Sequence, residues 1–152
     1  MGPATAFEGA CASGRPPSEE LPMTLPAITT LYAALLGLVG LALAGRVGML
    51  RVRTGVSIYD GGNKELAAAI RRHANFTEHV PLALILLALI EMGGAGATLM
   101  HVLGAALVAC RIAHPLGLDA DDMRKPLRGV GAAGTTLITL IASGVALSQT
   151  LL

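Results

Sequence analysis

The chain has 152 residues, of which 53% are hydrophobic and only 14% are charged. Soluble domains carry roughly a quarter charged residues, and a soluble core of this length could not bury so much apolar surface. The formal net charge of +1 leaves no broad basic face, which argues against nucleic acid as a partner. The composition instead indicates a small helical membrane protein.

Residues 1–22 differ from the rest of the chain because they are rich in Gly, Pro, Ser and Glu. They lack the apolar core of about 7–15 residues that a secretory signal peptide needs. We therefore expect a disordered leader, or an extension made by a start codon upstream of the natural initiator, Met23. Residues 23–152 are predicted to form a single membrane domain.

Four largely apolar stretches follow, at about residues 24–47, 64–92, 95–118 and 126–152. Each is long enough to cross a hydrocarbon core of about 30 Å as a helix. In the second stretch the uncharged part, Val80 to Ile90, is too short to span alone. The polar residues before it must therefore belong to the same helix. We predict an all-α fold, an integral membrane four-helix bundle.

Basic residues mark one side of this predicted bundle. They flank the loop between the first two spans and the loop between the last two, whereas the loop at residues 93–97 has none. Cytoplasmic loops of membrane proteins carry an excess of Lys and Arg. Both basic loops are therefore predicted to be cytoplasmic, and both chain termini are predicted to lie outside.

The segment from Arg71 to Pro81 concentrates polar groups at the head of the second span, where ionisable side chains are costly unless they have partners. On a helix Arg71, Asn75 and Glu78 share one stripe, whereas His73 points to nearly the opposite side. One subunit cannot direct the whole set into one cavity, so a shared role implies an oligomer. Glu78 needs a cationic partner, and Arg71 or a basic residue of another helix is the obvious one.

Further polar residues lie in the later spans close to the loop between them: Arg111, His114, Arg124 and Arg128. The alternative to a functional role is that basic side chains extend to the interface and bind lipid phosphates. That alternative does not explain Asn75 and Glu78, because neither binds phosphate as a cation.

Other isolated residues are expected to be structural. His101 and Cys110 are interpreted as packing residues, and Glu91 as an exposed charge at a helix end. The histidines and Glu78 lack the facing ligand pair at i, i+4 that a zinc site on one helix requires. No metal site is predicted.

The pattern Arg71-x-His73-x-Asn75-x-x-Glu78-x-x-Pro81 resembles the second-helix signature of the membrane-associated proteins in eicosanoid and glutathione metabolism, the MAPEG family. Three further segments support it: Leu50-Arg-Val-Arg53, Arg111-Ile-Ala-His114 and Arg124-Lys-Pro-Leu-Arg128. The resemblance covers about residues 23–152 and is closest in wording to short bacterial members, similar to microsomal glutathione transferase. It implies an integral protein of a bacterial inner membrane.

The resemblance also implies a homotrimer that binds glutathione as a co-substrate between subunits, near the cytoplasmic face. His73 would reach the pocket from the neighbouring subunit. The other residues that would line the pocket by position are Arg51, Arg71, Asn75, Glu78, His79, Arg111, His114 and Arg124. Arg128 matches the catalytic arginine that stabilises the glutathione thiolate, because a nearby guanidinium favours the charged form of a thiol.

The implied activity is that of a membrane-embedded glutathione transferase, or a glutathione peroxidase-like enzyme, acting on hydrophobic electrophiles or lipids. The alternative is a catalytically silent trimer that binds glutathione or another anionic amphiphile. Leu118 and His79 stand where the eicosanoid synthases have tyrosines, and Gly129 stands where the prostaglandin enzyme has serine. The specialised eicosanoid activities are therefore not predicted.

Overall fold

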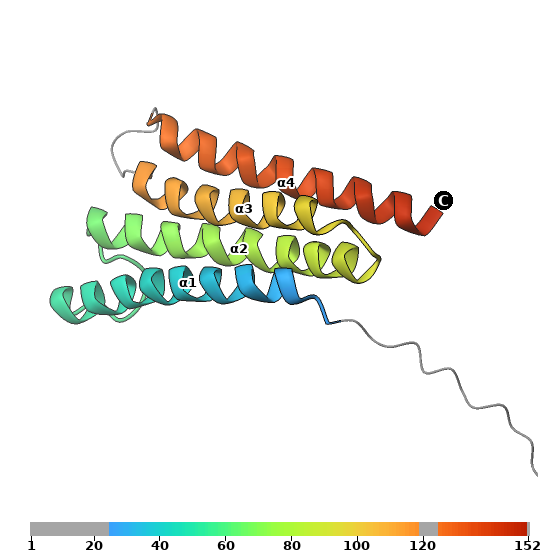
Figure 1. Ribbon diagram of the computed structural model, residues 1–152. Coiled ribbons are helices and arrows are strands. Elements are labelled where there is room, and N and C mark those ends of the chain that lie inside the picture. The colour runs from blue at the N-terminus through green and yellow to red at the C-terminus, as the bar shows by residue number, and fades with distance from the viewer. Residues whose placement is uncertain (1–24, 119–124, 152) are drawn as a thin grey trace, which may run out of the picture.

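The computed structural model describes residues 25–118 and 125–151. These residues form four helices and no strand: α1 (Ala27–Thr54), α2 (Lys64–Met92), α3 (Ala97–Gly117) and α4 (Pro126–Leu151). The helices lie side by side in one antiparallel bundle (Figure 1), and each is long and apolar enough to cross a membrane. The predicted all-α membrane bundle is confirmed. The expected leader and Arg124 lie outside the described residues.

The ends of α1 and α2 follow from local backbone chemistry. α1 continues beyond the predicted end at residue 47 to Thr54, and Gly55 then adopts the left-handed conformation (φ 68°) that closes many helices. α2 begins after Asn63, whose side-chain Oδ1 accepts the Leu66 N–H at 2.9 Å. This cap satisfies one of the first-turn N–H groups that a helix leaves unpaired.

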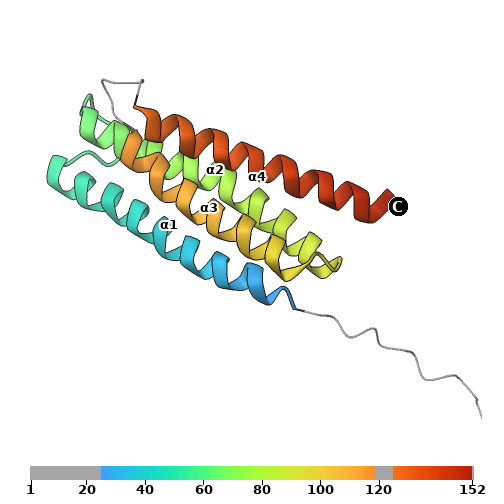
Figure 2. The same ribbon diagram turned by 45° about the horizontal axis from the view of Figure 1, so that its top comes forward.

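The four helices form a ring in the order α1, α2, α4, α3. α3 packs most closely on α4, α1 packs on α2 and α3, and α2 also packs on α4, whereas α1 and α4 do not touch. Figure 2 shows α1 and α4 on opposite sides of the bundle. The α1–α2 loop and the start of α4 lie at one end, which we name the basic end, and the α2–α3 loop lies at the other (Figure 1).

The core and the outer surface are both apolar, as expected for a bundle surrounded by lipid. Leu36, Leu87 and Leu107 from three different helices are fully or almost fully buried. Large side chains such as Leu38 and Leu140 are about two-thirds exposed on the outside. A soluble monomer rarely exposes so much apolar surface, so this surface fits the hydrocarbon interior of a bilayer.

Glycines allow the close approach of α3 and α4. A Cβ atom on Gly131 would lie 2.7 Å from both the Cys110 carbonyl oxygen and the His114 backbone nitrogen. A Cβ atom on Gly117 would lie 2.2 Å from the Arg128 backbone nitrogen. Small residues let membrane helices approach at this separation, and the approach positions the polar residues of both helices.

Glu91 is not the exposed end charge that was predicted. Its carboxylate accepts the backbone N–H groups of Ile28 at 2.8 Å and Thr29 at 2.7 Å. These groups belong to the first turn of α1, where unpaired N–H groups and the helix dipole favour a negative charge. The end of α2 therefore caps the start of α1, a contact that a reading of α2 alone could not anticipate.

The close contact of α3 and α4 can be tested at two glycines of the same helix. Gly131→Ala should lower the free energy of unfolding by about 1–3 kcal/mol, because the added methyl group meets backbone atoms that must shift. Gly129→Ala is the matched control, since its Cβ would meet nothing within 4 Å. In the control, alanine should be neutral or stabilising by up to about 1 kcal/mol. The free energy of unfolding of both variants in detergent is measured from the loss of the helical circular dichroism signal. Equal effects of the two substitutions would contradict the close approach of α3 and α4.

Candidate functional site

Arg111 is the centre of a polar cluster at the basic end of the bundle. Its side chain is buried, with only 2% exposed. One terminal nitrogen donates to Asn75 Oδ1 on α2 at 3.0 Å, and the other donates to the Gly131 carbonyl on α4 at 2.8 Å. The guanidinium thereby joins three helices.

The charge of Arg111 is not neutralised within the part of the chain that the structure describes. Both hydrogen-bond acceptors are neutral, and Nε is buried without a hydrogen-bond partner there. A buried charge is costly unless an opposite charge or further hydrogen bonds compensate it. Among the described residues the guanidinium therefore keeps an uncompensated positive charge.

His114 lies one turn from Arg111 on α3 and is also buried. Four basic side chains are close enough to act on it electrostatically: Arg111, Arg128, His79 and Arg71. They come from α2, α3 and α4, so the fold gathers predicted site residues that are far apart in the sequence. The result is a concentration of positive charge on the α2–α4 side of the bundle.

Arg71 and Glu78 form an ion pair, with the nitrogen 3.0 Å from the carboxylate oxygen. This is one of the two partners that the sequence analysis left open for Glu78. Both side chains remain about half exposed. Asn75 lies on the same stripe of α2, as the spacing predicted, but it is buried against Arg111. Four residues turn a helix by about 400°, so Asn75 lies about 40° round from Arg71. That rotation is enough to move it from the outer face into the core.

Arg128 lies in the first turn of α4, half-buried beside the end of α3. The close approach of Gly117 to the Arg128 backbone fixes this position. Leu118, which follows Gly117, is buried and offers no hydroxyl group. Arg128 is therefore held near His114, on which its charge acts.

Comparison with known proteins agrees with the signature in α2. The sequence pattern described as the MAPEG family matches residues 29–148. The chain belongs to the MAPEG family. Two similar proteins are the inner membrane protein YecN of Escherichia coli strain K12 and its counterpart in Escherichia coli O6:H1. Each is 32% identical over 118 residues, which cover 78% of this chain and 90% of the relative. No solved structure matches the chain.

Two residues that the MAPEG signature implies do not join the Arg111 cluster within one subunit. Arg51 donates from one terminal nitrogen to the carbonyls of Val56, Ser57 and Tyr59 at 3.0–3.2 Å, and so holds the α1–α2 loop. His73 lies about 200° round α2 from Arg71. A single subunit therefore leaves both residues away from the cluster around Arg111.

Gly131 is a site residue that the sequence analysis missed. Its carbonyl accepts Arg111, and it accepts the Thr135 hydroxyl at 2.9 Å as well. Gly131 and Gly134 both sit where a Cβ would clash with α3. Gly131 and Thr135 are small residues four apart in an apolar span. This spacing favours close packing of membrane helices, and the signal was available in this MAPEG sequence.

The Asn75–Arg111 hydrogen bond can be tested by removing its acceptor. Asn75→Leu keeps the side-chain size but leaves a donor of a buried guanidinium unpaired, so unfolding should be easier by about 1–3 kcal/mol. Thr77→Val is the control, because that hydroxyl is exposed and bonds only to carbonyls of its own helix. Its effect should stay within about 0.5 kcal/mol. Denaturant titration in detergent compares them; an Asn75→Leu variant as stable as the control would refute the role of the bond.

Proposed function

We propose that this MAPEG protein is a glutathione transferase, or a glutathione peroxidase-like enzyme, that acts on hydrophobic electrophiles dissolved in an inner membrane. The observation that carries the proposal is the buried Arg111 guanidinium, which has only neutral acceptors among the described residues. Glutathione has two carboxylates, one ammonium group and a thiol. A cluster with several cations and one carboxylate complements that distribution of charge.

The side chains of the cluster suggest separate tasks. Arg71 and the buried Arg111 would each bind a carboxylate of glutathione, because guanidinium groups form strong charge-assisted bonds to carboxylates. Glu78 would exchange part of its ion pair with Arg71 for the glutathione ammonium group. His79 and His114 would complete the wall of the pocket. These contacts would orient the thiol toward the start of α4.

Arg128 would supply the chemical activation. A free thiol has a pKa near 8.5 and reacts only as the thiolate. A guanidinium beside the sulfur favours the thiolate and lowers that pKa, at about 1.4 kcal/mol for each unit. The thiolate sulfur would then form a bond to an electrophilic carbon while the carbon's bond to its leaving group breaks.

The site would be completed by a second copy of the chain. We infer a homotrimer in which His73 and Arg51 of one subunit approach the Arg111 cluster of the next. Both residues lie outside their own subunit's cluster, and α2 exposes Arg71 and Glu78 on its outer face. The basic end would be cytoplasmic, both termini would be outside, and glutathione would enter from the cytoplasm.

The second candidate function is a catalytically silent trimer that binds glutathione or another anionic amphiphile. The same Arg111 cluster would hold an anion whether or not its thiol is activated. Leu118, buried at the edge of the cluster, provides no hydroxyl to contact sulfur, so activation would depend on Arg128 alone. If the protein binds glutathione but does not conjugate it to a generic electrophile such as a chlorodinitrobenzene, this candidate is supported over the enzyme.

Removal of the Arg128 charge distinguishes these candidates. In Arg128→Ala the pKa of bound glutathione thiol should rise, and turnover should fall tens-fold, which corresponds to about 2 kcal/mol. Thiolate absorbance in the ultraviolet, followed against pH at saturating glutathione, measures the pKa. Arg53→Ala is the matched control, because Arg53 is an exposed arginine in the last turn of α1. An unchanged titration in the Arg128 variant removes that residue from the mechanism.

The shared site predicts complementation between two inactive variants. His73→Ala and Arg71→Ala should each abolish glutathione binding, since each removes one side of every site. Every trimer that contains both variants should regain binding in about a third of its sites, because one of its three interfaces combines both intact residues. Calorimetry on co-expressed, tandem-purified subunits measures the recovery. No recovery, or a stable monomer by native mass spectrometry, would overturn the shared site.

A further inference from the structure

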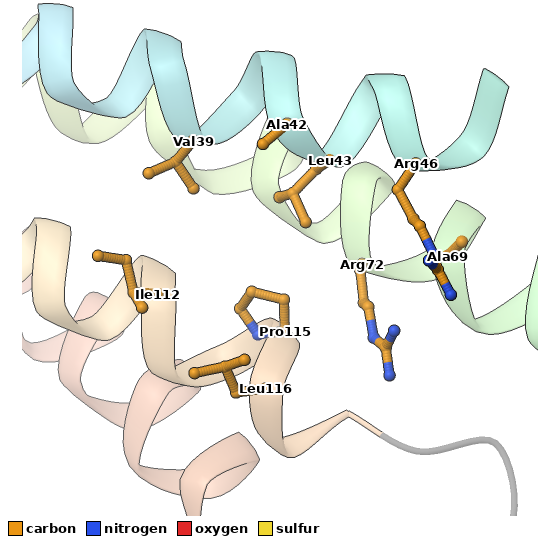
Figure 3. Close-up of a pocket in the computed structure, with 9 residues that line it drawn as sticks. All are labelled: Val39, Ala42, Leu43, Arg46, Ala69, Arg72, Ile112, Pro115 and Leu116. Atoms are coloured by element: carbon orange, nitrogen blue, oxygen red, sulfur yellow. The ribbon is translucent and has the colours of Figure 1, made fainter. Parts of the chain in front are cut away.

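A groove runs along the side of the bundle opposite the Arg111 cluster. It lies between α1 and α3, has a volume of about 340 Å³, and has Ala69 of α2 at its floor (Figure 3). The side chains of its two walls are all apolar: Val39, Ala42, Leu43, Ile112, Pro115 and Leu116. Leu116 and Ile112 are 69% and 46% exposed, so the groove is open to the surrounding lipid along α3.

Two arginines stand beside the apolar walls at the basic end of the groove. Arg46 comes from α1 and Arg72 from α2, and Figure 3 shows both side chains at the same end. Arg46 forms an ion pair with Glu65. No carboxylate among the described residues pairs with Arg72. The groove therefore combines a purely apolar body with a head that keeps one excess positive charge.

Arg72 is held in a fixed orientation. Its Nε and one terminal nitrogen donate to the Leu118 carbonyl at 3.2 and 2.5 Å. The other terminal nitrogen has no hydrogen-bond partner in residues 25–118 and 125–151. A basic side chain that only extended to the interface would remain flexible, whereas this one is anchored with a donor left over. Anchoring lowers the entropy that a ligand must remove on binding.

We propose that this groove binds one acyl chain of an anionic phospholipid from the surrounding bilayer, with the lipid phosphate on Arg46 and Arg72. The walls offer nothing to a polar solute. The volume is at the low end of small-molecule sites, which span about 300–1,000 Å³, and suits one chain rather than two. Arginine recognises phosphate through its planar set of donors, and the basic end places that recognition at headgroup depth.

This lipid site is independent of the proposed glutathione site. Both sites draw on α2 and α3, but they use different side chains: the groove is lined by Arg46 and Arg72, and Arg111 bonds to Asn75 and Gly131. Neither Arg46 nor Arg72 is assigned to glutathione. Occupation of the groove would tie α1 to α3 by filling the space between them, so the bilayer itself would contribute part of the packing.

The absence of tryptophan from the chain allows a direct test. Leu116→Trp places a single fluorophore on the groove wall, and Leu140→Trp places one on an equally exposed part of α4. The full-length protein is reconstituted in mixed vesicles in which either phosphatidylglycerol or phosphatidylcholine carries brominated chains, which quench tryptophan. At residue 116 the anionic lipid should be preferred about five-fold, the value expected for one basic charge near a membrane surface. At residue 140 the preference should be close to one.

Three changes in the Leu116→Trp background separate the groove from general surface charge. Arg72→Gln and Arg46→Gln should each reduce the preference for anionic lipid toward one. If loss of the Leu118 contact unfolds the Arg72 variant, the exposed Arg46 still provides the test. Ala42→Phe fills the groove, keeps both arginines, and should also abolish the preference. A preference that survives Ala42→Phe, or one that is equal at residues 116 and 140, overturns the proposal. Release of the quencher by stoichiometric oleate would overturn it in favour of a fatty-acid carboxylate. Glutathione should leave all these values unchanged.

Discussion

The rest of the structure depends on the two hydrogen bonds of the buried Arg111 guanidinium. They hold α2 through Asn75 and α4 through the Gly131 carbonyl, from a side chain that starts on α3. This contact depends on the absence of a side chain at Gly131, where a Cβ atom would lie 2.7 Å from backbone atoms of α3. Packing and polarity are therefore coupled at one place, and a change in either disturbs the other.

The order of the helices gives the bundle two chemically different sides. Because α1 and α4 do not touch, the α2–α4 side and the α1–α3 side are separated by the core. The first gathers basic residues around a carboxylate and suits a water-soluble anion at the membrane surface. The second joins an apolar groove to two arginines and suits an amphiphile already in the bilayer. Both lie toward the basic end, where lipid headgroups and cytoplasmic solutes meet.

Several polar groups of this bundle make contacts that limit the cost of placing them there. Glu91 caps α1, Arg51 gathers loop carbonyls, and Arg72 is anchored on Leu118. In lipid an unpaired backbone or side-chain polar group costs several kcal/mol. These contacts therefore lower the cost of keeping charged side chains near the helix ends. Arg111 differs from these residues because it is buried, has only neutral acceptors among the described residues, and keeps Nε without a partner there. That difference is what makes a bound anion the natural completion of the fold.

The amino-acid sequence by itself determined the number of spans, the helical class and the family. Four apolar stretches must become helices because lipid offers no partner for backbone groups, and the Arg71–Pro81 segment carries the family signature. It also predicted that Glu78 has a cationic partner and offered Arg71 as one of two candidates, because residues on one stripe of a helix meet without help from the rest of the fold. Only the tertiary structure decided that Asn75 turns inward to Arg111, that Glu91 caps another helix, and that Arg72 faces a lipid-exposed groove. A helical wheel gives only the direction in which each side chain points from one helix axis. The residue that it meets there depends on how closely the neighbouring helices pack. Here glycines on α3 and α4 set that distance.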